Sequence, residues 1–427
     1  MSALQRNLLL LIALVLALQT GVNLARYLQE PGAAQRFGGD FICFWQAAQR
    51  ARHGDLAGVY DPAFWRGVVS GHAASKMTWF VYPPFVLLPL RLLGDLGYGP
   101  AVAWWSLLPL PFYFGLIFLL ARRTAPDLAA GTRLQAFAAI AALTLPFLSA
   151  SLFSGQIGAF VAVLFLAAAY LWPDRPILAG LCLGLMAVKP QLGVLFPFAL
   201  AAAGQWRTMA AAAATVLALV ASSLVWPGAA VWNDYAQIAQ IFGRFIGQGH
   251  AVIAQLAVGP YVSLLAAGLP AALAATLQAG VSLGVLAVVI RVFRQAAGGR
   301  DDGRLDLRLG LLAAGALLAI PYSLSYDTPM LALAILPLVT RAWRRGLDGW
   351  TCAAITGLLV LPYLQPILIP RHLPFALAAL LLAFGALFRR YELEAPADAA
   401  AAGSGWLSAI RSWIAPRAAI AAQRIRP

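Results

Sequence analysis

Long apolar runs that end in arginine constrain the fold of this chain more than any other feature. Hydrophobic residues make up 62 % of its 427 residues and charged residues 11 %. In soluble domains about 45–50 % of the residues are apolar and about 25 % are charged. The runs are rich in Leu, Ala and Val and lack the short alternation of a membrane β-barrel, so helices must satisfy the backbone in lipid. The sequence therefore predicts an all-α, polytopic membrane protein.

Arginines in short loops predict the orientation of the chain in the membrane. The net charge is +14, and arginines at the ends of apolar runs follow the positive-inside rule. They indicate membrane topology and no nucleic-acid partner. Counting roughly 20 residues per span predicts about twelve transmembrane helices in an inner (plasma) membrane, with both termini cytoplasmic. The clusters lie at Arg6, Arg122, Arg123, Arg133, Arg175, Arg207, 291–308, 341–345, Arg389 and Arg390.

The polar segments divide the chain into one large domain, 1–390, and a tail, 391–427. The first periplasmic loop, 26–99, is expected to carry juxtamembrane helices, and its apolar stretch 80–93 is expected to be juxtamembrane or re-entrant, since a full span there would place Arg122 and Arg123 outside. A second large periplasmic loop is expected at 226–259. The sequence of the tail predicts a basic amphipathic helix that lies on the cytoplasmic leaflet.

One acid stands out in a chain that has only 16 Asp and Glu residues. Asp40 follows two glycines and precedes a stretch, 41–52, that predicts an amphipathic helix. An acid beside aromatic residues at a bilayer surface usually has a partner or a function. Asp before a helix is also a common N-cap, and the two roles are compatible. Asp40 is the candidate catalytic residue.

Lys189 is the second candidate, because a lysine followed by proline between apolar runs is costly in lipid unless it faces a cavity or binds an anion. A compact ammonium suits a phosphate group, although lysines also extend readily to the membrane interface. Asp327 enters an apolar helix and could complement Lys189, or could cap a helix that starts at Thr328.

Five further residues are predicted to contact substrate. Gln156 and Gln191 carry amides that suit sugar hydroxyls, although amides also bond helices to one another. Tyr82 and Tyr326 place hydroxyls at outer helix ends, where an interfacial aromatic belt would also put them. His250 could shuttle protons or touch phosphate.

The three cysteines, Cys43, Cys182 and Cys352, lie far apart without metal-ligand spacing.

Five motifs occur in an order that resembles glycosyltransferase family eighty-seven, which has the GT-C fold and includes polyprenol-phosphate-mannose-dependent α-mannosyltransferases. The resemblance covers about residues 5–390. It rests on Gly-Asp-Phe-x-x-Phe-Trp from Gly39, Val-Tyr-Asp-Pro from Val59, Tyr-Pro-Pro from Tyr82, Ser-Gly-Gln from Ser154, and Leu-Ala-Gly from Leu178 to Lys-Pro-Gln at Lys189.

The resemblance implies an inverting transferase that takes a hexose, such as mannose, or a pentose from a polyprenyl-phosphate donor in a periplasmic cavity. The acceptor would be a hydroxyl of an envelope glycan or glycolipid. The resemblance implies that Asp40 is the base and that Lys189 meets the lipid phosphate, with no metal and no cofactor. A single base and a cation suffice for this chemistry.

Two other classes remain open at this point. A transporter or flippase of a lipid-linked substrate could have a similar number of helices with broken segments, although no inverted repeat supports it. A structural partner without catalysis would require Asp40 to point away from the cavity.

Overall fold

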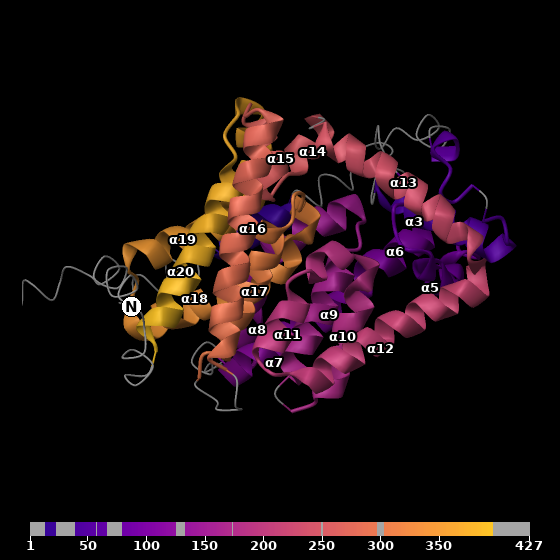
Figure 1. Ribbon diagram of the computed structural model, residues 1–427. Coiled ribbons are helices and arrows are strands. Elements are labelled where there is room, and N and C mark those ends of the chain that lie inside the picture. Colours follow the sequence, from indigo (N-terminus) through magenta and orange to yellow (C-terminus); the bar gives the residue numbers. More distant parts are fainter. Residues whose placement is uncertain are drawn as a thin grey trace, which may run out of the picture.

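The computed structural model describes residues 13–22, 39–56, 58–65, 79–124, 133–172, 174–248, 251–296 and 303–395. Within these ranges the chain is helical, and the only extended pairing is an isolated bridge between Ala257 and Leu324. The amphipathic helix expected in the tail lies outside the described residues. Figure 1 shows the helices as two adjoining groups, α16 to α20 on one side and α3 to α12 on the other.

Among the elements that follow the described residues 13–22, α3, α5 and α6 lie on the side of the molecule farthest from α20, whereas α7 lies near the centre beside α8 (Figure 1). The elements of this part of the chain are α3 (Phe41–His53), η1 (Pro84–Val86), α5 (Leu87–Leu90), η2 (Arg91–Leu93), α6 (Tyr98–Leu107) and α7 (Pro109–Thr124). Gly54 ends α3 with a φ of +78°, a left-handed conformation that favours glycine. The segment Pro84–Leu93 is about 15–20 Å long at helical rises per residue. It is too short to cross a bilayer core of about 30 Å.

The middle of the chain contains a helix that is broken in two. The elements are α8 (Arg133–Ser154), α9 (Gly158–Leu171), α10 (Pro176–Leu185), η3 (Met186–Val188), η4 (Pro190–Gly193), α11 (Phe196–Ala202) and α12 (Trp206–Ser223). Gly180 and Gly184 let α10 lie against α12, because a Cβ atom there would be 2.4 Å from the Thr208 oxygen and 2.5 Å from Thr215 Cβ. Small residues four apart allow such close approach in membrane helices.

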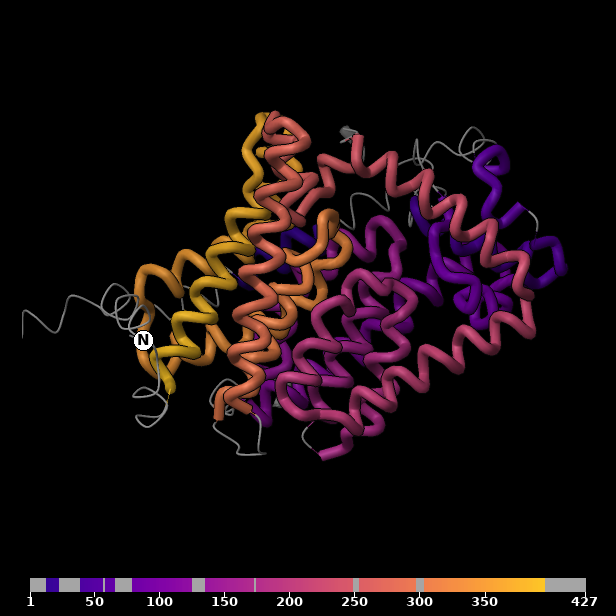
Figure 2. Tube along the Cα trace, in the orientation of Figure 1, coloured from indigo at the N-terminus to yellow at the C-terminus, as the bar shows by residue number. Residues whose placement is uncertain are grey.

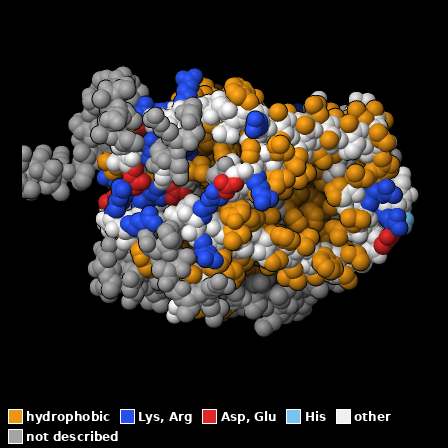
Figure 3. Space-filling view, turned by 90° about the horizontal axis from the view of Figure 1, so that it is seen from below, with side chains coloured by type: hydrophobic (Ala, Val, Ile, Leu, Met, Phe, Trp, Pro, Cys, Tyr) orange, Lys and Arg blue, Asp and Glu red, His pale blue; other side chains and the backbone are white. Residues whose placement is uncertain are grey.

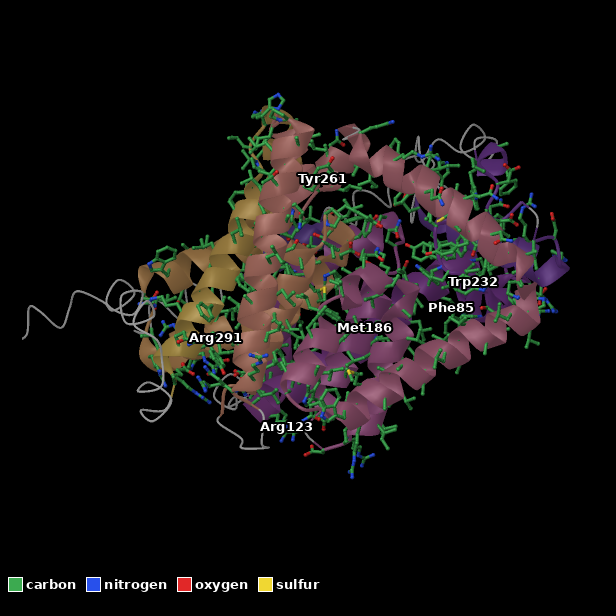
Figure 4. The ribbon with its side chains drawn as sticks, viewed as in Figure 1. Phe85, Arg123, Met186, Trp232, Tyr261 and Arg291 are labelled. Atoms are coloured by element: carbon green, nitrogen blue, oxygen red, sulfur yellow. The ribbon has the colours of Figure 1, made fainter. Side chains whose placement is uncertain are left out.

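The segment 226–259, expected as the second large periplasmic loop, contains three helices. After η5 (Leu224–Gly228), the 18-residue α13 (Ala230–Gly247) is followed by α14 (Ala251–Leu256) and α15 (Pro260–Ala266). Figures 1 and 2 show α12 leaving the bundle and α13 returning across the upper side toward α14. The rings of Phe85 and Trp232, 6.3 Å apart, join α13 to η1 (Figure 4).

The last group of helices surrounds a buried centre. It comprises α16 (Ala271–Arg294), α17 (Leu305–Ala319), η6 (Ser325–Leu331), α18 (Ala332–Arg345), α19 (Gly349–Leu368), η7 (Ile369–Arg371) and α20 (Phe375–Leu393). Residues 307–318 of α17 are buried on every face, and α17 packs against α16, α18 and α20. A helix that is apolar all round belongs in such an interior position.

Five helices of the described chain are long and apolar enough to cross a membrane. They are Tyr98–Thr124, Gln135–Ser154, Trp206–Gly228, Ala271–Arg294 and Gly349–Arg371. Many large apolar side chains on them are exposed, for example Leu217 at 69 % and Leu283 at 67 %, as lipid contact requires. The all-α membrane class is confirmed, whereas the count of about twelve spans stays a prediction.

Charged side chains gather at one end of the molecule. Arg123 and Arg291 lie at the lower end in Figure 4, and Tyr261 lies at the upper end. Figure 3, seen from below, shows the charged side chains beside a broad apolar surface with a hollow in it. Basic residues also occupy the last turns of α7, α16, α18 and α20.

Candidate active site

One cavity brings together seven of the eight residues that the sequence singled out. It has a volume of about 210 Å³ and lies among α3, the turn before α9, the break after α10, α13 and η6. Asp40, Tyr82, Gln156, Lys189, Gln191, Tyr326 and Asp327 all line it. The eighth residue, His250, lies outside the described residues, so its role stays a prediction.

The Ser-Gly-Gln motif forms a turn that holds Asp40 from two sides. Gly155 adopts a φ of +68°, which favours glycine, and thereby reverses the chain after Ser154. The Asp40 backbone N–H donates to the Ser154 carbonyl at 2.8 Å. The side-chain amide of Gln156 donates to Asp40 Oδ2 at 2.9 Å.

The carboxylate of Asp40 does not cap the helix that it precedes. Asp40 occupies the N-cap position of α3, but its side chain makes no capping hydrogen bond. Its oxygen instead faces Gln156 in the cavity. Asp40 therefore occupies the backbone position of a helix cap, but its side chain makes the contacts of a residue in the site.

A second set of hydrogen bonds fixes the orientation of the Gln156 amide. The Tyr82 hydroxyl donates to Gln156 Oε1 at 2.8 Å. Burial raises the pKa of Tyr82 well above its usual value, so Tyr82 remains a donor. Tyr60 in turn donates to the Tyr82 carbonyl at 2.7 Å. Because Gln156 Oε1 accepts from Tyr82, its amide nitrogen is left to donate to Asp40.

Burial is the main influence on the charge of Asp40. Asp40 is half-buried, and desolvation raises the pKa of its carboxyl. The hydrogen bond from Gln156 and the positive charge of Lys189 lower the pKa and oppose this effect only in part. Asp40 is therefore a stronger base than an exposed aspartate.

Lys189 and Asp327 form a buried ion pair in the same cavity. Both side chains are about 5 % exposed, and Lys189 Nζ lies 2.5 Å from Asp327 Oδ1. The ammonium also lies 4.4 Å from the centre of the Tyr326 ring. Lys189 therefore faces the cavity and does not extend to the membrane interface.

The Lys-Pro sequence explains where the Lys189 side chain points. A residue before proline avoids the helical region, and Lys189 has φ −133° and ψ 73° between η3 and η4. The helix therefore breaks at Lys189, and the ammonium enters the cavity between the two halves.

Asp327 fills both roles considered for it. Its Oδ1 atom pairs with Lys189, and its Oδ2 atom accepts from the Leu324 N–H at 3.1 Å. The helical turn that it stabilises begins at Ser325, three residues earlier than the expected start at Thr328.

A very close backbone contact holds η6 against α9. A Cβ atom at Gly158 would lie 1.7 Å from the Tyr326 carbonyl oxygen. Only glycine fits here. The contact fixes the segment that carries Tyr326 and Asp327.

Several aromatic residues of the cavity were not predicted as site residues. Trp79, Tyr235, Phe242, Phe245 and Tyr322 line it. Tyr235, Ala239 and Phe242 recur at helical spacing on amphipathic α13, and this periodicity is the signal that could have revealed them.

Three further residues near the cavity or its elements have other surroundings. Arg244, on α13, is exposed and does not line the cavity. Asp61 accepts from the Ala63 N–H at 2.8 Å and so forms an Asx turn. Cys43 lines the cavity with its thiol bonded to the Asp40 carbonyl. The described residues contain no cluster of metal-ligating side chains, and metal independence stays a prediction.

The fold and the cavity define an all-helical membrane protein with a polar, partly enclosed site. The family model of glycosyltransferase family 87 matches residues 80–321, more than half of the chain. The chain belongs to glycosyltransferase family 87. The predicted resemblance is thus confirmed, and membership supports a transferase over a transporter. The matched residues include Gln156 and Lys189 but neither Asp40 nor Asp327.

The other two comparisons add no relatives. A search of curated proteins found no match, and neither did a search of solved structures.

Proposed function

We propose that this membrane glycosyltransferase transfers a hexose, such as mannose, or a pentose from a polyprenyl-phosphate donor to a hydroxyl of an envelope glycan or glycolipid. The transfer inverts the anomeric carbon and takes place at the periplasmic face of the bacterial inner membrane. The roles of the cavity residues follow from their contacts.

The observation that carries the proposal is the unequal state of two carboxylates in one cavity. Asp327 is ion-paired with Lys189, whereas Asp40 accepts a hydrogen bond from the neutral amide of Gln156. A paired carboxylate is a weak proton acceptor, because protonation would break its ion pair. Asp40, with its raised pKa, is the better base.

Asp40 serves as the general base of an inverting transfer. As the acceptor oxygen attacks the anomeric carbon, its proton passes to Asp40 while the bond from the sugar to the phosphate oxygen breaks. The electron pair of that bond remains on the polyprenyl phosphate. A single carboxylate suffices, whereas glycoside hydrolysis requires two.

Lys189 stabilises the departing phosphate. An ammonium has three N–H donors, and only one is needed for the bond to Asp327. The other two can reach a donor phosphate in the cavity, and positive charge at the leaving group lowers the barrier. Asp327 then keeps Lys189 in place between turnovers. The amide of Gln191 and the hydroxyl of Tyr326 lie in the same cavity and would contact the sugar.

The charge distribution supports the proposed side of the membrane. The cavity lies toward the end of α17 that leads into η6, while Arg304 precedes the other end. Arginine-rich ends face the cytoplasm. This rule supports a cavity that faces the periplasm, where polyprenyl-phosphate sugars would meet envelope acceptors.

The test is transfer by the purified protein in proteoliposomes with radiolabelled polyprenyl-phosphate sugars. Asp40→Asn keeps the size of the side chain but cannot accept the proton, so we expect transfer to fall by about 10²–10⁴-fold. Asp61→Asn is the matched control, because its amide preserves the Asx turn outside the cavity. Transfer by Asp61→Asn and by the wild type in EDTA should be unchanged.

Two results would overturn the proposal. Near-normal transfer by Asp40→Asn would remove Asp40 as the base. Movement of the intact donor across the bilayer without transfer would assign a flippase.

A further inference from the structure

A second cavity adjoins the first cavity, which holds Asp40 and Lys189. It has a volume of about 220 Å³ and lies among residues 13–22, the end of α8, α14, the start of η6 and the end of α19. Leu256, the last residue of α14, lines both cavities. Ser325 lines the second cavity, and the next residue, Tyr326, lines the first. The two cavities are therefore direct neighbours.

The helical turn η6 presents different faces to Lys189 and to the second cavity. Tyr326 and Asp327 both contact the ammonium of Lys189 in the first cavity. Ser325 instead lines the second cavity. Consecutive side chains of a 3₁₀-helix point about 120° apart. The second cavity therefore lies across η6 from Lys189.

The end of α8 joins the second cavity to Asp40. Ser149, Ala150 and Phe153, from the last turns of α8, line the second cavity. The next residue, Ser154, accepts the backbone N–H of Asp40 at 2.8 Å through its carbonyl. The candidate base and the second cavity are thus built on the same end of one helix.

Hydroxyl and amide groups contribute to the lining of the second cavity. The side chains that carry them are Thr20, Ser149, Gln255, Ser325, Tyr363 and Gln365. Phe153, Pro362 and Pro366 add apolar surface. Hydroxyls and amides both donate and accept hydrogen bonds, as the hydroxyls of a sugar ring require, while apolar side chains suit its C–H faces. Binding sites commonly combine an apolar lining with a few such polar groups.

The two amides of this lining have different surroundings. Gln365 is 1 % exposed, donates to the Ala257 carbonyl at 2.7 Å and accepts from the Ala376 N–H at 2.8 Å. Gln255 is exposed, and its amide makes no hydrogen bond within the described part of the chain. Gln365 therefore fixes the wall, and Gln255 is free to bind a ligand.

The hydroxyl groups divide in the same way. Ser149 donates to the Pro146 carbonyl at 2.7 Å, and Tyr363 donates to the Leu16 carbonyl at 2.6 Å. The hydroxyl of Ser325 has no partner among the residues that the structure describes. Gln255 and Ser325 thus offer unused hydrogen-bonding groups beside the first cavity.

We infer that the second cavity binds the acceptor, as the sugar ring of a glycan or glycolipid whose hydroxyl receives the transferred sugar. The inference rests on the proposed function and adds to it the place of the acceptor. Gln255 and Ser325 bind hydroxyls of this ring, and the apolar wall packs against its C–H face.

The chemistry of an inverting transfer requires such a place. The acceptor oxygen bonds to the anomeric carbon from the side opposite the phosphate, while the bond from that carbon to the phosphate oxygen breaks. The acceptor proton passes to Asp40, and the electron pair stays on the phosphate, which faces Lys189. The second cavity meets both conditions, because it adjoins Asp40 through α8 and lies across η6 from Lys189.

The test is the dependence of transfer on acceptor concentration, measured with the purified full-length protein in proteoliposomes. The donor is radiolabelled polyprenyl-phosphate mannose, and the acceptor probes are methyl and octyl glycosides of mannose, glucose and galactose. The variants are Gln255→Ala, Ser325→Ala and the two combined, which remove no hydrogen bond within the described chain. Gln240→Ala is the matched control, because Gln240 is an exposed glutamine of α13 that lines neither cavity.

We expect KM for the acceptor to rise by about 3–10-fold in each single variant and by about 10–100-fold in the double variant, since each change removes one hydrogen bond to the sugar. KM for the donor stays at the wild-type value, a difference that a general loss of structure would not produce. Gln240→Ala keeps both values. Transfer to octyl glycosides alone identifies a membrane-bound glycolipid acceptor, and equal transfer to methyl glycosides identifies a free glycan.

The possible failures can be told apart. An unchanged acceptor KM in the double variant would overturn the inference and leave the proposed function standing. Hydrolysis of the donor by the wild type without transfer to any glycoside would also exclude a sugar acceptor in this cavity. No consumption of the donor would overturn the proposed function itself. Each single variant tests the cavity by itself, so misfolding of one leaves the other as the test.

Discussion

Gln156 donates to the carboxylate of Asp40 across 2.9 Å while its own oxygen accepts from Tyr82 at 2.8 Å. The two residues come from motifs 116 positions apart, and within the described part of the chain no other side chain donates a hydrogen bond to that carboxylate. The protonation of the candidate base is therefore sensitive to one neutral amide.

Gln156→Leu should move the acidic limb of the pH–rate profile to higher pH. The amide lowers the pKa of Asp40, and its removal raises that pKa further. Since transfer requires ionised Asp40, activity is lost as pH falls through this pKa, and a higher pKa moves the loss to higher pH. The measurement is the transfer rate across the acidic and neutral pH range. Tyr82→Phe should shift the acidic limb by a smaller amount than Gln156→Leu. An unmoved limb would show that Gln156 does not tune the base.

Asp40→Asn should raise the unfolding temperature at neutral pH even as it removes activity. Burial raises the pKa of Asp40 above its unfolded value, so the folded state holds more protons and stability falls as pH rises through the folded pKa. The amide has no such penalty. The difference in unfolding temperature between variant and wild type should shrink as pH falls toward about 4, the usual aspartate range. A variant less stable than wild type at neutral pH would contradict this account.

Lys189→Met should destabilise the protein by roughly 3–5 kcal/mol, because it leaves the carboxylate of Asp327 buried and unpaired. Adding Asp327→Asn should recover most of the lost stability without restoring transfer. Denaturant or thermal unfolding of the two single variants and the double variant measures the coupling. Additive effects would mean that the ion pair makes no net contribution.

Lys189→Arg separates charge from geometry at the same position. The guanidinium keeps the charge but is larger and planar, so we expect partial transfer and weaker donor binding. The measurement is transfer rate against polyprenyl-phosphate-sugar concentration, scaled to folded protein. Wild-type kinetics for Lys189→Arg and for folded Lys189→Met would remove Lys189 from the site.

Gly158→Ala should destabilise the protein by about 1–3 kcal/mol and lower transfer, because the new methyl group overpacks against the Tyr326 carbonyl and displaces η6. Gly280→Ala is the matched control: it lies in α16 with nothing within 4 Å of the added carbon, and alanine there should be neutral or stabilising by up to about 1 kcal/mol. Thermal unfolding of both variants is the measurement. Equal stability of the two would show that η6 moves freely.

The sequence predicted the broad architecture because local patterns determine it. Apolar runs specify membrane helices, and the proline after Lys189 specifies the break between α10 and α11. The 18 helical residues of α13 lie within the segment expected as the second large periplasmic loop, and their amphipathic periodicity is the signal that favours a helix there. Unbroken apolar runs identify helices that face lipid, whereas an amphipathic helix is found only from its periodicity.

By itself the sequence determined the all-helical membrane class, the family and the residue types of the candidate site. Only the tertiary structure decided their partners. Asp40 bonds Gln156 instead of capping α3, and Lys189 pairs with Asp327, 138 positions away. Capping and helix breaks depend on backbone geometry within a few residues, whereas these side-chain pairs form only after α9, α10 and η6 have packed together. Burial in that packed arrangement, and not residue type, makes one aspartate a candidate base and the other the partner of a lysine.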